Sequence, residues 1–383
     1  MAMARGEYPL QRLRSRGTVL ALAAALASFP SLFSASPASD VPEYKAGVAE
    51  RAFKPNKAYN WRGAKTHALL STVWYPAVAT AVEQAQWIPP TGQAFASAGK
   101  AARDAAMVST PAKLPLIVLS HGTGGSALQM AWLGTVLATR GYIAAAVNHP
   151  GNNGYDGYTA QGFSTWWERA RDLSTVIDAM LADPTFGVRI DSGQIGAAGF
   201  SLGGYTMIEI AGGITDPAEF KAFCQSPRAD AICKSPPEFP KLTEQFDELS
   251  KHDAEFQEAL RHAGDSYRDP RIRAVFAMAP ALGPAFTPAS LEKISIPVEI
   301  VAGDRDENVP IESSAKFFAA HIPSAKLTIL PGGIGHYVFL GTCTAAAKQS
   351  VPLICVDAPG VDRDAIHTRA AALALSFFVD NLY

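Results

Sequence analysis

Residues 196–207, GAAGFSLGGYTM, place three glycines and one serine within six positions, directly after a run of small apolar residues. The pattern G-x-S-x-G around Ser201 is typical of a turn between a buried strand and a helix that presents a nucleophilic serine. Gly199 and Gly203 allow such a sharp turn to pack close to its neighbours. Ser201 would then stand at the N-terminus of a helix, whose positive end favours a developing negative charge. The alternative is an ordinary glycine-rich turn, and the rest of the chain decides between the two.

The segments around this turn alternate between short apolar runs and stretches of helical periodicity. Strands are predicted in HALLSTVWYPA and at 114–120, 142–148, 194–200, 272–280, 297–303 and 326–331. Helices are predicted at 127–141, 164–183 with Ser164 as N-cap, 205–212, 312–322 and 364–382. This alternation predicts an α/β fold with a mostly parallel central sheet and helices on both faces. Residues 40–66 and 78–112 fall outside the pattern, and we expect an irregular segment and a long surface excursion there.

One polar segment, residues 213–271, interrupts the alternation. It contains KLTEQFDELSKHDAEFQEALRHAG, which predicts a surface helix or a helix pair. Insertions at the C-terminal edge of such a sheet commonly cover the binding crevice. We therefore interpret the segment as a lid, and a plain surface insertion is the alternative.

The N-terminus has the layout of a secretory signal peptide. Four arginines precede the apolar run GTVLALAAALASFPSLF, which is followed by the small residues SASPAS. We predict cleavage after Ala38, so that residues 1–38 are the signal and 39–383 form one α/β domain in the periplasm or outside the cell. A stable membrane anchor is disfavoured, because the apolar run is shorter than the ~20 residues that a span needs.

The composition is that of a globular protein. With 48% hydrophobic and 18% charged residues the chain can form a sizeable core, and a net charge of −2 gives no reason to expect a nucleic-acid partner.

Four cysteines in an exported protein predict disulfides, and loop-closure entropy favours the sequence-local pairs Cys224–Cys233 and Cys343–Cys355. The cysteine and histidine spacings fit no zinc site, so we predict no metal.

A serine nucleophile needs a base, and the base needs an orienting carboxylate. In this architecture the order along the chain is serine, acid, histidine. His336 follows the strand at 326–331 and is the candidate base. Asp306 follows the strand at 297–303 and is the favoured acid, because it lies a turn beyond the strand; Asp304 is expected to shape the loop instead.

The oxyanion of an acyl-transfer transition state needs preorganised N–H donors. Leu202, the residue after the nucleophile, is the candidate for one donor, and the loop LSHGTGGS after an early strand supplies Thr123 as the candidate for the other. His121 in the same loop is interpreted as a packing residue that holds the turn. The GTGG motif is not a phosphate-binding loop, because no G-K-[ST] follows it.

The motifs occur in the order seen in α/β-hydrolases: LSHGTGGS, NHPGNNG, GFSLGG, AGDRDENVP and GIGHYVFL. The first two resemble those of bacterial dienelactone-hydrolase-like proteins related to platelet-activating-factor acetylhydrolases, and the likeness spans about residues 65–383. It implies an α/β-hydrolase fold, Ser201, Asp306 and His336 as a catalytic triad, and Thr123 and Leu202 as oxyanion donors. Dienelactone hydrolase itself uses cysteine where this chain has Ser201, which argues against a dienelactone substrate.

These residues predict a serine hydrolase that cleaves a small-molecule carboxylic ester, short in acyl chain or soluble, through an acyl-enzyme and without a cofactor. The same residues could serve an amidase, a peptidase or an acyltransferase, and a non-catalytic binding protein on the same fold is the alternative from another class. Trp132, Trp166 and Trp167 are candidates for an aromatic pocket wall or for the core.

Overall fold

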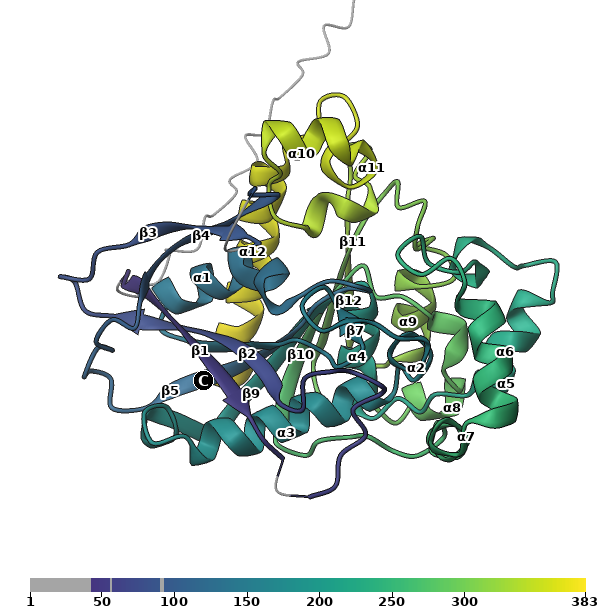
Figure 1. Ribbon diagram of the computed structural model, residues 1–383. Coiled ribbons are helices and arrows are strands. Elements are labelled where there is room, and N and C mark those ends of the chain that lie inside the picture. The colour runs from purple at the N-terminus through teal and green to yellow at the C-terminus, as the bar shows by residue number, and fades with distance from the viewer. Residues whose placement is uncertain (1–42, 56, 90–92) are drawn as a thin grey trace, which may run out of the picture. The chain divides into compact units, whose positions relative to one another are not determined.

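The computed structural model describes residues 43–55, 57–89 and 93–383. Strands from most of this length pair into one ten-stranded β-sheet (Figure 1). The predicted signal peptide, residues 1–38, lies outside the described residues. The strand order is β12-β11-β10-β9-β5-β6-β2-β1-β4-β3. The strands are β1 (Lys45–Phe53), β2 (Leu69–Ala77), β3 (Gln84–Ile88), β4 (Ala96–Arg103), β5 (Leu114–Ser120), β6 (Ile143–Val147), β9 (Ile190–Phe200), β10 (Ile272–Met278), β11 (Val298–Gly303) and β12 (Ala325–Leu330).

The neighbouring strands β12, β11, β10, β9, β5 and β6 are all parallel, as the alternation of strands and helices predicts. β2 runs antiparallel to both β6 and β1. A separate two-stranded ribbon joins β7 (Asn152–Asn153) and β8 (Gly157–Tyr158). The parallel strands end at one edge of the sheet, so the loops that follow them lie along that edge.

Helices cover both faces of the sheet because successive strand residues point to opposite sides. Ile117 and Leu119 of β5 pack with α1 (Ala131–Thr139) and α12 (Arg363–Leu382) in one core cluster. The alternate β5 residues pack with α3 (Glu168–Ala182) and α4 (Leu202–Ala211) in the other. Figure 1 shows α1 and α12 on one side of the strands and α3 on the other. The α/β-hydrolase fold predicted from the sequence is confirmed in this arrangement.

The remaining helices are short and lie mostly in the connections. They are α2 (Ala160–Ser164), α5 (Pro217–Cys224), α6 (Leu242–His252), α7 (Ala254–Arg261), α8 (Pro288–Leu291), α9 (Ala315–His321), α10 (Ala345–Ser350) and α11 (Pro352–Cys355). Short 3₁₀ turns occur at η1 (Ala127–Met130), η2 (Gly187–Arg189), η3 (Ala231–Cys233), η4 (Gly283–Ala285) and η5 (His336–Phe339). No helix of the described residues is long and apolar enough to span a bilayer.

The N-terminal third of the domain is more regular than predicted. β1 lies within 40–66 and pairs with β2 along its whole length, from Lys45 opposite Ala77 to Phe53 opposite Leu69. The predicted surface excursion at 78–112 contains β3 and β4, which extend the same sheet. Backbone pairing with a neighbouring strand stabilises these segments, and that is a long-range effect that local apolar periodicity does not report.

The predicted helix start at Ser164 is wrong. Ser164 is the last residue of α2, and α3 begins at Glu168 with Trp167 at its N-cap. The Thr159 side chain accepts a hydrogen bond from the Gly162 N–H and starts the earlier turn of helix instead.

The insertion at 213–271 forms α5, η3, α6 and α7, so its long polar stretch is a helix pair. Figure 1 shows α5, α6 and α7 gathered at one end of the molecule. The structure contains the two predicted disulfides: Cys224–Cys233 joins the end of α5 to η3, and Cys343–Cys355 ties the loop before α10 to α11.

Candidate active site

Ser201 occupies a strained turn between β9 and α4. Its backbone has φ 58° and ψ −116°. Residues other than glycine rarely adopt a positive φ. The turn is held by the Ser201 N–H, which donates to the Met278 carbonyl at 2.9 Å. A Cβ on Gly203 would lie 2.0 Å from the Ser120 carbonyl oxygen, and one on Gly199 would lie 2.3 Å from the Gly203 carbonyl oxygen. Glycine is therefore required at both positions for the turn to close.

Three of the predicted site residues meet at this turn. His336 Nε2 lies 2.9 Å from Ser201 Oγ, and His336 Nδ1 lies 2.7 Å from Asp306 Oδ2. Ser201 follows β9, Asp306 follows β11, and His336 begins η5 after β12. All three side chains are more than nine-tenths buried. The geometry is that of a hydroxyl held by a base whose other nitrogen is oriented by a carboxylate.

Asp306 is fixed by its own loop. Its Oδ1 accepts hydrogen bonds from the N–H groups of Asn308, at 3.1 Å, and Val309, at 2.8 Å. These two donors leave Oδ2 free to face His336. Asn308 and Val309 were not singled out from the sequence, although an Asp followed two and three residues later by free N–H groups is a common loop pattern.

Asp304 holds the loop that carries the imidazole. Its carboxylate accepts hydrogen bonds from the N–H groups of Ile334 at 2.8 Å, Gly333 at 2.9 Å and Gly332 at 3.0 Å. These bonds, that of Ile334 most of all, lower the pKa of the Asp304 carboxyl. The two acids of AGDRDENVP therefore have different partners, His336 for Asp306 and the backbone before His336 for Asp304.

The candidate oxyanion donors lie beside Ser201. Thr123 and Leu202 line the same cavity as the serine, and a Cβ on Gly122, the residue before Thr123, would lie 3.3 Å from Ser201 Cβ. In the described parts of the chain, neither the Thr123 nor the Leu202 N–H donates to another residue. Neither N–H group is therefore occupied by a partner among the described residues.

His121 lies beneath this loop and not in the cavity. Its Nδ1–H donates to the Gly122 carbonyl at 2.7 Å, and its Nε2 accepts from the His149 N–H at 3.2 Å. Burial lowers the pKa of His121 well below its ordinary value, so the ring is neutral. This is the packing arrangement expected for His121 from the sequence.

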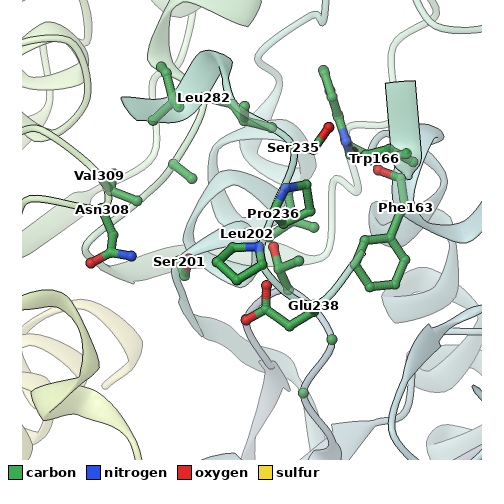
Figure 2. A pocket seen from close by; sticks show the side chains of 18 of the residues that line it. Phe163, Trp166, Ser201, Leu202, Ser235, Pro236, Glu238, Leu282, Asn308 and Val309 are labelled. Carbon is green, nitrogen blue, oxygen red and sulfur yellow. Dashed lines mark hydrogen bonds between the residues drawn. The ribbon is translucent and has the colours of Figure 1, made fainter. Parts of the chain in front are cut away.

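The cavity at Ser201 has a volume of about 1470 Å³ and is walled largely by aromatic and aliphatic side chains. Figure 2 shows Phe163 and Trp166 on one side of Ser201 and Asn308 and Val309 on the other. Trp167 also lines the cavity, whereas Trp132 packs in the core with its ring stacked on His367 at 4.3 Å between centroids. The predicted aromatic wall therefore holds for two of the three tryptophans.

The insertion supplies much of the remaining wall, including Phe220, Ile232, Pro236, Leu242 and Phe246. It also supplies a carboxyl that the sequence analysis did not single out: Glu238 lies between Ser201 and Phe163 in Figure 2. Burial raises the pKa of Glu238. No hydrogen bond or ion pair joins its side chain to another residue of the described ranges.

Within the described residues, no cluster of three or more His, Cys, Asp or Glu side chains has the geometry to hold a metal ion. Ser201, His336 and Asp306 form a hydrogen-bonded chain of the kind used in nucleophilic acyl transfer, and the candidate oxyanion donors Thr123 and Leu202 line the same cavity. This combination on a parallel α/β sheet defines a serine hydrolase of the α/β-hydrolase superfamily.

Comparison with known proteins places the chain more narrowly. Residues 112–340 match the family Hydrolase_4, described as serine aminopeptidase, S33. The match covers more than half of the chain, so the protein belongs to this family and is a hydrolase. A search of curated proteins finds no match.

Among solved structures, the fold is similar to that of a ferulic acid esterase from Streptomyces cinnamoneus. The TM-score is 0.55 at 21% sequence identity, and the match covers 91% of this chain and 92% of the other. At this identity the likeness establishes the shared fold. The narrower resemblance to dienelactone-hydrolase-like proteins is tested by neither comparison and stays a prediction.

Proposed function

We propose that this protein is an exported serine esterase that hydrolyses carboxylic esters of soluble acids through an acyl-enzyme. One observation carries the proposal: the unbroken hydrogen-bond chain from Asp306 through His336 to Ser201, at a strained turn that opens into a large apolar cavity. The family supports hydrolysis, and the two disulfides together with the N-terminal sequence pattern support export.

In the proposed reaction His336 Nε2 takes the proton from Ser201 Oγ as the oxygen attacks the ester carbonyl. The Thr123 and Leu202 N–H groups hold the oxyanion of the tetrahedral intermediate. His336 then gives the proton to the leaving alcohol oxygen, and the acyl-enzyme forms as the C–O bond breaks. Asp306 keeps the Nδ1–H tautomer and stabilises the imidazolium. Water, activated by His336, then releases the acid and restores Ser201.

The decisive test is Ser201→Ala, assayed with a panel of p-nitrophenyl esters from acetyl to octanoyl and with a feruloyl ester. Loss of a triad nucleophile lowers kcat by several orders of magnitude, so we expect activity at the background rate with an unchanged circular dichroism spectrum and Tm. A fluorophosphonate probe should label the parent on the peptide that contains Ser201 and leave the variant unlabelled. Turnover by the pure, folded variant at the rate of the parent would refute the mechanism.

Amide cleavage is the second candidate, because the family description names an aminopeptidase. Glu238, an unpaired carboxyl in the cavity wall, is suited to accept a hydrogen bond from a free amino group of such a substrate. Aminoacyl p-nitroanilides assayed beside the esters distinguish the two. Higher kcat/KM for the anilides would replace the esterase proposal by a peptidase with the same three residues.

A further inference from the structure

A second Ser–His–Asp array lies beneath the oxyanion loop. Ser120 Oγ is 2.9 Å from His149 Nε2, and His149 Nδ1 is 2.7 Å from Asp172 Oδ2. These distances equal those of Ser201, His336 and Asp306. Each of the three side chains is 0% exposed, however, and none lines the cavity. A substrate has no access to Ser120, so the array has another role.

The protonation of the array follows from its surroundings. Burial, reinforced by Arg169 and Arg62, lowers the pKa of His149 well below its ordinary value. The neutral ring donates from Nδ1 to Asp172, which also receives two hydrogen bonds from Arg62 Nη2 at 2.6 and 2.9 Å. Nε2 is then an acceptor, and the Ser120 hydroxyl donates a hydrogen bond to it. The Ser120 oxygen is thereby turned into an acceptor for a further donor.

That donor is Arg169 of α3. Its Nη2 lies 3.3 Å from Ser120 Oγ and also donates to the His121 carbonyl. Its Nη1 donates to Asn152 Oδ1 at 3.3 Å, and the same amide oxygen accepts from the Gly124 N–H at 2.8 Å. The guanidinium therefore binds the loop directly at His121, before Gly122 and Thr123. It binds the loop indirectly, through Asn152, at Gly124, which follows them.

We propose that Arg169 and Asn152 are positioning residues, which orient the Thr123 N–H toward the oxyanion, and that Ser120, His149 and Asp172 hold the guanidinium in place. The inference rests on the proposed function. Oxyanion donors stabilise a transition state only when they are aligned before the reaction. Thr123 makes no hydrogen bond of its own from its N–H to the described residues, so its direction is set by the bonds on either side of it.

The test removes one of these attachments. Asn152→Ala deletes the acceptor of the Gly124 N–H and also the bond from Asn152 Nδ2 to the Gly162 carbonyl at 3.2 Å. Asn152 does not line the cavity and makes no hydrogen bond to Ser201 or His336. We expect kcat/KM for p-nitrophenyl acetate to fall about tenfold, less than the hundredfold or more that follows loss of an oxyanion donor itself. The Ki of a trifluoromethyl ketone, which forms a tetrahedral oxyanion on Ser201, should rise by the same factor, while KM stays near that of the parent.

The neighbouring Asn153 provides a matched control. It is equally buried, but its amide nitrogen donates to the His149 carbonyl at 2.8 Å and to Asp156 Oδ2 at 3.0 Å. Its amide oxygen accepts from the Tyr155 and Asp156 N–H groups, so its side chain makes no hydrogen bond to the oxyanion loop. Asn153→Ala should lower Tm and leave kcat/KM and the Ki within about twofold of the parent. Arg169→Lys keeps the charge but cannot reach both acceptors, and it should reproduce the selective loss of Asn152→Ala.

The proposal is overturned if Asn152→Ala and Arg169→Lys lower Tm but keep the kcat/KM and Ki of Asn153→Ala. It is also overturned if all three variants lose activity equally, because that pattern indicates a general loss of structure. Either result leaves a parent that hydrolyses esters at Ser201. Failure of the proposed function gives a different result, a parent inactive toward every ester of the panel.

Discussion

At the scale of single residues, two carboxylates separated by one arginine have unrelated tasks. Asp306 faces the imidazole at 2.7 Å, whereas Asp304 binds three backbone N–H groups of the loop that leads to His336. The same side chain type therefore acts on the base directly in one case and through the backbone of its loop in the other. The sequence ranks Asp306 over Asp304 as the candidate acid on its position after the strand, and Asp306 is the one of the two whose carboxylate hydrogen-bonds to the imidazole.

Exchanging each carboxylate for an amide separates these tasks. Asp306→Asn should lower kcat about 10⁴-fold, because an amide permits the wrong imidazole tautomer and does not stabilise the imidazolium. Asp304→Asn keeps one acceptor oxygen and loses the other, so kcat should stay within about threefold while Tm falls by a few degrees. Steady-state kinetics and thermal melts of both variants check this. If Asp304→Asn showed the larger loss of kcat, the assignment of the acid would have to be reversed.

The contribution of Asp304 to the stability of the folded protein depends on pH. Because its pKa is lowered in the folded protein, its stabilising contribution is present above the pKa of the unfolded chain and is lost as pH falls through the folded value. The difference in Tm between the parent and Asp304→Asn should therefore shrink below about pH 4. Melts from pH 3 to 7 measure it.

At the scale of elements, the parts of the fold predicted from the sequence are those whose local pattern matches their environment. β5, β6 and residues 195–200 of β9 are buried on both faces and appear as continuous runs of apolar and small residues. β1, β3 and β4 contain charged or small residues, and it is their pairing with neighbouring strands that makes them strands. The candidate triad was predicted because each member follows a strand. Arg169, Asn152 and Glu238 were missed because their roles depend on contacts between elements distant in sequence.

The insertion is the element with the largest predicted effect on specificity. Phe220 and Phe223 lie one turn apart on α5, but Phe220 lines the cavity and packs edge-on against Trp166 at 5.3 Å between centroids, whereas Phe223 does not line it. Phe220→Ala enlarges the cavity, so we expect the ratio of kcat/KM for octanoyl over acetyl esters to rise several-fold. Phe223→Ala is the matched control and should keep the ratio of the parent.

Reaction of Ser201 with a small fluorophosphonate should proceed at the parent rate in both variants, since neither phenylalanine contacts the reacting groups. The acyl-length profile is the deciding measurement. Identical profiles for Phe220→Ala and the parent would show that the insertion is a surface addition and that the remaining cavity wall sets specificity.

At the scale of the whole molecule, the candidate site lies in the loops at the ends of the strands, whereas the apolar core lies on the two faces of the sheet. β5, β9, β11 and β12 each end in a loop that brings one part of the candidate site to the same edge of the sheet. The two apolar clusters on the faces of the sheet fix the positions of these strand ends. Changes in the insertion can therefore alter the cavity without disturbing the sheet, whereas changes in the core should alter the stability of the domain.

Glu209 is one of the acids that are buried inside the domain. It lies on α4 with 0% exposure, and its carboxyl contacts Thr215 Oγ1 at 3.1 and 3.2 Å. Burial raises its pKa from 4.5 to about 8. The folded state therefore keeps this proton in a pH range where the unfolded chain has lost it. The stability that the proton provides is complete below pH 4.5 and is lost as pH rises toward 8, by at most about 1.4 kcal/mol per pH unit.

Glu209→Gln removes this titration while keeping the size of the side chain and an acceptor for Thr215. Relative to the parent, the variant should gain stability as pH rises from 5 to about 8, with little further change above. Urea unfolding at intervals of one pH unit measures the difference, and Glu219→Gln on the exposed face of α5 is the control that should show a flat difference over the same range. Parallel pH profiles for Glu209→Gln and the parent would mean that Glu209 is ionised in the folded protein, and its negative charge would then need a cationic or hydrogen-bonding partner beyond Thr215.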